Sequence, residues 1–188
     1  MYCIFVGKYL KPDLSISHRY IMKFVVRSRM RYSEMNGGKG KSVFEEELKS
    51  VFESMERMMC STNKDLQRAQ VFYMEHIFTT IPDFLMADFN RQELSEIMMG
   101  LIQTLPRNHL CNEKMVAIND LVKSRLFVHQ ECRAVMLQKM MDIIDETLAD
   151  PDSNSKLINL ATDTLGDILI KLHRDTFLWN LDLCETDI

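Results

Sequence analysis

The sequence contains no stretch in which apolar and polar residues alternate with a period of two, the pattern of a half-buried strand. It also contains no uninterrupted apolar run near the roughly 18 residues that a membrane span needs. The opening residues, MYCIFVGKYLKP, lack the charged start of a secretory signal, and their apolar part is too short to cross a bilayer. These absences argue against a β-sheet and a membrane span, and they predict a soluble, cytoplasmic protein.

Paired cysteines are missing as well. The five cysteines are an odd number, and no two of them form a CxxC pair. A zinc site needs clustered ligands that close a small tetrahedron, so the sequence predicts no metal site. Scattered free thiols fit a reducing, intracellular compartment. The five are Cys3, Cys60, Cys111, Cys132 and Cys184.

Charge is distributed unevenly along the chain. The formal net charge of −4 and the pI of about 5.7 argue against a nucleic-acid partner. Residues 1–41, however, carry nine Lys or Arg against two acidic residues, a net charge of +7 that leaves −11 for the rest. Within this basic region, Arg27, Arg29 and Arg31 form a candidate surface for an acidic partner or an anionic lipid. The alternative is an ordinary solvated helix face.

Three stretches repeat apolar residues at spacings of three and four, which places each set on one face of a helix. Helices that bury such stripes against one another make an all-α protein, and 188 residues with 46% hydrophobic content suffice for one sizeable core. The stripes are Leu94, Ile97, Met98, Leu101, Ile102 and Leu105; Cys132, Val135, Met136, Met140, Ile143, Ile144 and Leu148; and Leu157, Leu160, Ala161, Leu165, Ile168, Leu169 and Leu172.

The basic region is expected to contain the first helix, from His18 to about Tyr32. Apolar residues recur along this segment at helical spacing, and we expect them to pack inward. The inward set is Ile21, Phe24, Val25 and Ser28.

Further helices are expected at short intervals. Asn90 with Glu93 marks the start of one helix, and Pro82 and Pro106, 24 residues apart, are each placed to stop a helix. One helix and a short turn fill about this length, so the helices need no long crossovers. Antiparallel helix pairs at this spacing predict an armadillo- or HEAT-like α-solenoid, with a compact helical bundle as the alternative. We expect an N-terminal extension over residues 1–17, the helical domain over 18–174 and a C-terminal tail over 175–188.

The segment GGKGKS, residues 37–42, resembles a phosphate-binding loop but lacks its first glycine, whose position is occupied by Met35. The loop should follow a buried strand, whereas the residues before it read as a helix. Ser42 is instead expected to form a capping box with Glu45 at the start of the next helix. No nucleotide cofactor is therefore predicted.

The turn around Pro151 matches part of a calcium loop. Asp150, Asp152 and Asn154 occupy the first three ligand positions, but the required glycine is Ser155 and the required glutamate is Ala161. Short carboxylates are ordinary in turns, where they bond nearby amides, so no calcium site is predicted.

No motif predicts an enzyme. The histidines are isolated from one another, and neither an HExxH motif nor a paired-carboxylate spacing is present. A catalytic set assembled from distant residues remains an alternative. The last four residues, ETDI, have the shape of a PDZ-binding tail, for which a chance match is the alternative. The histidines are His18, His76, His109, His129 and His173.

Several short stretches carry a family resemblance: RSR at residues 27–29, LPRNHL at 105–110, LVKSRLF at 121–127 and ECR at 131–133. From about His18 to Arg174 the chain resembles the central, armadillo-like helical region of dedicator of cytokinesis (DOCK) proteins, of the type that includes insect myoblast city. The likeness is strongest between Leu105 and Leu137.

The resemblance implies a non-enzymatic part of a larger protein. DOCK proteins are guanine-nucleotide exchange factors for Rac-type small GTPases, and they carry an SH3 domain, a lipid-binding C2-like domain, the helical region and an exchange domain. This sequence resembles the helical region alone. The implied function is a structural interaction module that positions the lipid-binding and exchange domains, which are expected outside this sequence. Contacts with Rac, an ELMO-type adaptor or the plasma membrane are expected only through those other domains.

Two other functions remain open at this point. One is an independent α-solenoid adaptor that binds a peptide or an acidic partner through the basic first helix. The other is a small nucleotide- or metal-dependent enzyme, favoured only by GGKGKS and the turn at Pro151.

Overall fold

The computed structural model describes residues 13–37, 41–86 and 89–185, and every regular element in these ranges is a helix. The all-α class predicted from the apolar stripes is confirmed. The helices are α2 (Asp13–Met35), α3 (Lys41–Met59), η1 (Lys64–Leu66), α4 (Gln67–His76), η2 (Ile77–Thr80), α5 (Ile81–Met86), α6 (Arg91–Gln103), α7 (Cys111–Lys123), η3 (Leu126–Val128), α8 (Gln130–Ala149) and α9 (Ser155–Glu185).

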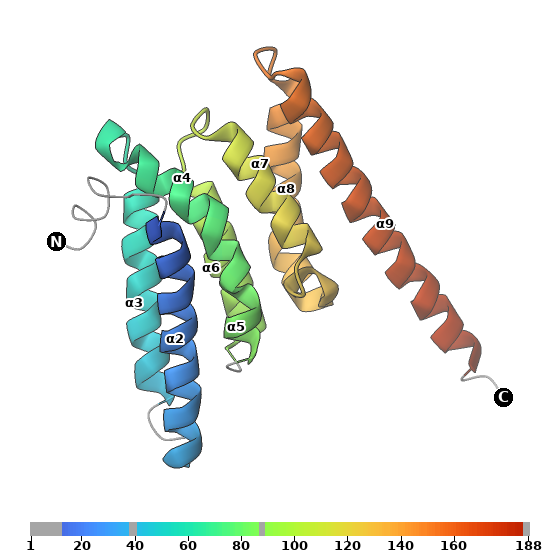
Figure 1. Ribbon diagram of the computed structural model, residues 1–188. Helices are drawn as coiled ribbons and strands as arrows, with labels where there is room; N and C mark the ends of the chain where they lie inside the picture. Colours follow the sequence, from blue (N-terminus) through green and yellow to red (C-terminus); the bar gives the residue numbers. More distant parts are fainter. Residues whose placement is uncertain (1–12, 38–40, 87–88, 186–188) are drawn as a thin grey trace.

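The long helices alternate in direction and follow one another across the molecule, from α2 and α3 at one end to α9 at the other (Figure 1). Helix α4 packs on α7 and α7 on α9, while α3 packs on α6 and α6 on α8. Helix α2 packs on α4, α5 and η2. Each helix therefore contacts its counterparts in the neighbouring pairs, which is the arrangement of an α-solenoid. The predicted stack of antiparallel pairs is confirmed, and the compact bundle is not adopted.

The three predicted stripes supply most of the core. Two of their members are exceptions, because Leu148 and Leu169 are exposed. No helix within the described residues is long and apolar enough to cross a membrane. The stripe residues that are at most 1% exposed are Leu94, Met98, Leu101, Ile102, Cys132, Met136, Met140, Ile144, Ala161 and Ile168.

The first helix differs from the prediction. It begins at Asp13 and ends at Met35, so it extends beyond both predicted ends. The predicted inward set was wrong, because Ile21, Phe24, Val25 and Ser28 all face solvent. The buried side of α2 is the opposite one, where Val26 is 1% exposed. Periodicity reveals that a helix has an apolar side, but it does not reveal whether another helix covers that side.

Helix ends follow the predicted signals at two places. The Asn90 side chain accepts a hydrogen bond from the backbone N–H of Glu93 at 3.0 Å and so caps α6, as predicted. Pro106 lies just past the end of α6, also as predicted. Pro82 does not stop a helix: it is the second residue of α5, where a missing N–H leaves no hydrogen bond unmade.

The domain limits at residues 17 and 174 stay a prediction, and α2 and α9 run past these two positions.

Candidate functional site

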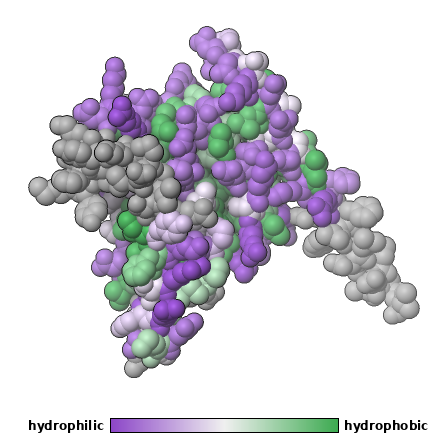
Figure 2. Space-filling model, in the orientation of Figure 1, coloured by the Kyte–Doolittle hydropathy of each residue, from purple (hydrophilic) through white to green (hydrophobic). Residues whose placement is uncertain are grey.

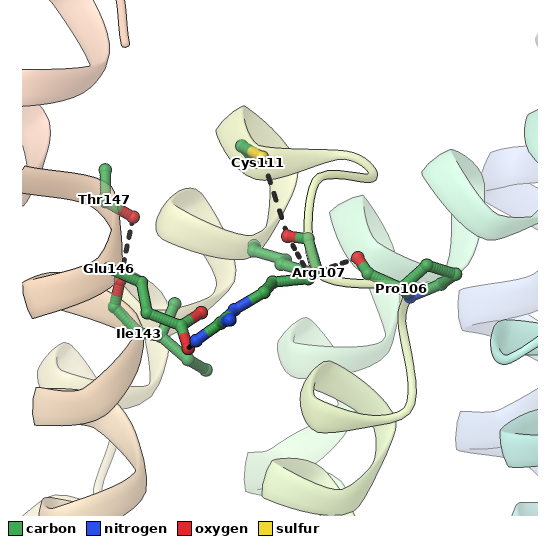
Figure 3. A network of polar contacts seen from close by, with 7 residues as sticks. Pro106, Arg107, Cys111, Ile143, Glu146 and Thr147 are labelled. Atoms are coloured by element: carbon green, nitrogen blue, oxygen red, sulfur yellow. Dashed lines mark hydrogen bonds and ion pairs between the residues drawn. The ribbon is translucent and has the colours of Figure 1, made fainter. Parts of the chain in front are cut away.

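The loop between α6 and α7 contains LPRNHL, one of the stretches that carry the family resemblance. Its Arg107 points away from the loop to Glu146 on α8 (Figure 3). The Nε of Arg107 donates to Oε1 of Glu146 at 3.0 Å, and Nη2 contacts the same oxygen. Hydrogen bonding from Arg107 lowers the pKa of Glu146. This pair joins the loop to a helix 39 residues further along the chain.

Lys114 of α7 binds the same loop. Its Nζ donates to the carbonyl oxygens of Pro106, at 2.7 Å, and Arg107, at 3.1 Å. Lys114 is 7% exposed, and burial lowers the pKa of its ammonium group. The ammonium thus bonds carbonyl groups of the loop, which ends at Leu110 in the left-handed region (φ 54°) just before α7. The Pro106 carbonyl oxygen also accepts from the backbone N–H of His109 at 3.0 Å.

A cavity of about 370 Å³ lies beside this loop and is lined by Arg107, Lys114, Glu146 and Ser153, among others. Ser153 Oγ donates to the carbonyl oxygen of Thr147 at 2.8 Å, which ties the α8–α9 turn to α8. Cys111 also lines the cavity, and its Sγ lies 4.0 Å from the Arg107 carbonyl oxygen. The cavity therefore lies between helices, and Arg107, Glu146, Lys114 and Ser153 in its lining are hydrogen-bonded to one another or to the backbone.

A second polar joint connects this loop to α4. Gln70 is fully buried, and the two N–H groups of its Nε2 are shared among the carbonyl oxygens of Met58, Met59 and Ser61, at 3.1, 3.1 and 2.7 Å. Its Oε1 lies 2.8 Å from Nε2 of His109. Since this amide oxygen only accepts, His109 is the donor. One glutamine thus holds the end of α3 and the α6–α7 loop together.

The third joint lies at LVKSRLF and ECR, between α7 and α8. Arg133 donates to the carbonyl oxygens of Phe127 and Val128 at 2.9 and 2.8 Å. Lys171 on α9 donates to the carbonyl oxygen of Val122. Both cations approach the buried ring of Phe127, at 6.0 Å for Arg133 and 5.7 Å for Lys171. Burial lowers the pKa of Lys171.

No contact among the described residues supports the phosphate-loop or the calcium-loop interpretation. Residues 38–40 and the side chain of Ser42 lie outside the described residues, so the capping box stays a prediction; α3 begins at Lys41. Asp150 accepts a hydrogen bond from the N–H of Asp152 at 3.0 Å, and Asn154 accepts one from Leu157 at 2.9 Å. These are the contacts of a turn and a helix cap.

In the part of the chain that the structure describes, no group of three His, Cys, Asp or Glu side chains could hold a metal ion. Burial raises the pKa of the Cys132 thiol, which keeps this core cysteine protonated. Of the ETDI tail, Glu185 ends α9 and residues 186–188 lie outside the described residues, so the PDZ-binding interpretation stays a prediction. The chain's lack of catalytic residues and cofactors stays a prediction.

Two of the three arginines of the candidate partner surface are exposed, and the third is half-buried. Arg27 and Arg31 are exposed. Arg29 is half-buried, with its guanidinium carbon 5.2 Å from the ring of Tyr32 and 5.4 Å from that of Phe44 on α3. It therefore joins α2 to α3. A partner for this surface stays a prediction.

Comparison with known proteins covers most of the chain. The dedicator of cytokinesis (DOCK) TPR region, as a protein family, matches residues 13–181. The chain belongs to the DOCK family. The mouse (Mus musculus) and human (Homo sapiens) relatives named dedicator of cytokinesis protein 3 are each 29% identical to it over 126 residues. The alignment covers 63% of this chain and 6% of each relative, so the chain spans a small part of their length.

The DOCK resemblance expected from LPRNHL and LVKSRLF is thus confirmed for the family and its helical region, while the myoblast-city-like type stays a prediction. These stretches lie at the joints between successive helices. Arg107, His109 and Arg133 each make a hydrogen bond that fixes a turn. The sequence patterns did not indicate that Gln70 and Lys114 join neighbouring elements. A polar residue within a helical apolar pattern is the signal that could have indicated them.

Proposed function

We propose that this DOCK helical region is a structural interaction module that positions the lipid-binding and exchange domains of a longer DOCK-type protein. The observation that carries the proposal is the continuous core from α3 to α9, fixed at its turns by buried polar joints. Such a stack transmits orientation, because each pair of helices is held by its neighbours. The comparisons support it by matching the TPR region of the family.

In this proposal, catalysis belongs to other parts of the protein. Rac-type GTPases and an ELMO-type adaptor are contacted by other domains, and the protein is cytoplasmic and recruited to the plasma membrane through its lipid-binding domain. Purified residues 1–188 should leave the release of fluorescent nucleotide from Rac at its intrinsic rate. Acceleration of release by the chain alone would contradict the proposal.

The positioning role is tested in a longer relative. Residues 13–181 replace the matched segment in mouse dedicator of cytokinesis protein 3, with fluorophores in the chain on either side. Energy transfer between the two fluorophores should have a narrow distribution of efficiencies in the chimera and in its Leu101→Met variant. The Leu101→Asp variant should give a broad distribution with a different mean. Identical transfer in all three chimeras would show that the helical stack does not set the distance.

The alternative, an independent adaptor that binds an acidic partner through α2, is favoured by one observation. That helix presents an apolar and basic side to solvent.

A further inference from the structure

The cavity beside the α6–α7 loop contains a buried ammonium group that forms no ion pair with any described residue. This group belongs to Lys114, which is 7% exposed and lines the cavity of about 370 Å³. Its Nζ donates to the carbonyl oxygens of Pro106 and Arg107, which are both uncharged acceptors. An ammonium has three N–H donors, so one of them has no acceptor among the described residues. Burying a charge without a partner of opposite sign is costly, and such charges are normally paired.

The two carboxylates in the cavity lining do not neutralise this ammonium. Glu146 binds Arg107 through Oε1, and these two side chains neutralise each other (Figure 3). Burial lowers the pKa of Lys114 more than the negative charge of Glu146 raises it. Asp150 lies in the α8–α9 turn, where it accepts a hydrogen bond from the N–H of Asp152 at 3.0 Å. Lys114 and Asp150 therefore each keep a charge that is not paired with the other.

The first turn of α7 adds hydrogen-bond donors at the same cavity. Cys111 is the first residue of α7 and also lines the cavity, and Figure 3 shows it at the start of this helix. Leu110, at the N-cap position, makes no side-chain capping hydrogen bond. The first helical bond runs from the N–H of Lys114 to the carbonyl oxygen of Leu110, and the N–H groups of residues 111–113 donate to no other described residue. Free N–H groups at a helix N-terminus favour an anion.

The charges of the lining select the kind of anion. A group with one negative charge matches the single unpaired ammonium of Lys114. A phosphate carries about −1.5 to −2 charges at pH 7, and its second charge would be repelled by Glu146 and Asp150. The cavity is much larger than a single carboxylate, so the anionic group belongs to a larger molecule. Hydrophilic residues predominate at the top of the molecule, where the α8–α9 turn lies, and this surface suits a polar ligand (Figure 2).

We propose that this cavity binds a carboxylate group, carried either by an acidic side chain of a peptide or by a small carboxylic acid. The carboxylate oxygens accept from Nζ of Lys114 and from the backbone N–H groups at the start of α7. The bound group thus pairs the ammonium and caps the helix at the same time. This site does not depend on the positioning role proposed above.

The test is an NMR titration of isotope-labelled residues 1–188 with N-acetylglutamate amide. Its control ligand is N-acetylglutamine amide, which has nearly the same shape and no charge. The glutamate ligand should shift the backbone amide signals of residues 111–113, and the glutamine ligand should not. Butyrate and inorganic phosphate are titrated in parallel at equal ionic strength, and phosphate should bind at least about tenfold more weakly than the carboxylate ligand.

The two carboxylate ligands distinguish the possible sources of the group. Binding of the glutamate ligand alone would identify the natural ligand as a peptide, and binding of butyrate alone would identify it as a small acid. Binding of both would show that the carboxylate group itself is sufficient. Each of these three results supports the proposed site.

Substitutions in the lining test the role of charge. Lys114→Met should weaken binding of the glutamate ligand about tenfold or more, because it removes the charge that pairs with the carboxylate. Lys171→Met is the matched control, since Lys171 also donates to a backbone carbonyl group but is not part of the lining, and it should leave binding unchanged. Asp150→Asn should strengthen binding about threefold, because it removes a negative charge and keeps an oxygen that accepts from the N–H of Asp152.

Circular dichroism establishes which variants are folded, and if Lys114→Met does not fold, the Asp150→Asn titration decides the question. The proposal would be overturned by unshifted amide signals at residues 111–113, by equal shifts with the glutamine ligand, or by equal binding to wild type and a folded Lys114→Met variant. Tighter binding of phosphate than of the glutamate ligand, or weaker binding by Asp150→Asn, would also overturn it.

Discussion

Helices α2 and α6 are both amphipathic, yet they use their apolar sides in opposite ways. Leu94, Met98 and Leu101 of α6 are at most 1% exposed, because α3 and α8 cover this side. On α2, Phe24 is 72% exposed, and the helix packs through its other side. The position of a helix in the stack, rather than its periodicity, decides which side is buried.

The polar side chains of the inner helices and those of α2 also differ in their surroundings. Between the inner helices, Gln70, Lys114 and Arg133 have their hydrogen bonds within the protein. On α2, Arg27 and Arg31 face solvent. We expect the inner joints to contribute to stability and the exposed arginines of α2 to contribute little to it.

The largest effect is expected from Leu101→Asp. This substitution places an unpaired carboxylate in the core between α3, α6 and α8. The cost is several kcal/mol, which is on the order of the free energy of unfolding of a whole domain. Thermal unfolding followed by circular dichroism should show loss of the folded state, while Leu101→Met should retain it. A melting temperature near that of wild type for Leu101→Asp would contradict the assignment of the core.

A smaller loss is expected from Gln70→Ala. The Met59 and Ser61 carbonyl groups and the His109 ring lose the Gln70 amide, and the Met58 carbonyl group keeps the backbone N–H of Ser61, so the cost is about 1–3 kcal/mol in urea unfolding. The double variant with His109→Ala should cost less than the sum of the two single variants, because both remove the same contact. Strict additivity would show that the glutamine and the histidine are not coupled.

Lys114→Met should change the pH dependence of stability. Burial lowers the folded-state pKa of Lys114 below its ordinary 10.5, so in the interval between the two pKa values the unfolded chain binds more protons. Lys114 therefore makes the free energy of unfolding rise as pH increases through that interval towards 10.5. Urea unfolding of wild type and Lys114→Met from pH 7 to 10.5 measures this, and the variant should show a shallower rise. Parallel curves would contradict the burial of this ammonium group.

The smallest effect on stability is expected from Phe24→Asp. Its side chain is exposed, so the free energy of unfolding should change by at most about 0.5 kcal/mol, as for other surface substitutions. The measurement is urea unfolding in parallel with Leu101→Asp. A loss of several kcal/mol would show that the Phe24 side of α2 is buried in solution.

The sequence was sufficient to predict the all-α stack, because the stripes of α6, α8 and α9 repeat over three or more turns. It was also sufficient for the Asn90 cap, which depends on contacts within one turn. The prediction was wrong about the buried side of α2, because residues distant in sequence decide which side of a helix is covered. It was wrong for Pro82 because the same residue is compatible with the first turn of a helix and with its end. The joints at Gln70 and Lys114 involve partners 7 to 39 residues away, which spacing does not specify.

Hydroxyl-radical footprinting of the intact chain tests the central contrast most directly, because one experiment reports on both regions. Tyr20, Phe24 and Met35 on α2 should be oxidised rapidly, whereas Phe52, Phe84 and Phe127, each at most 2% exposed, should be protected until the protein unfolds. Protection of Phe24 to the same degree as Phe127 would contradict the account.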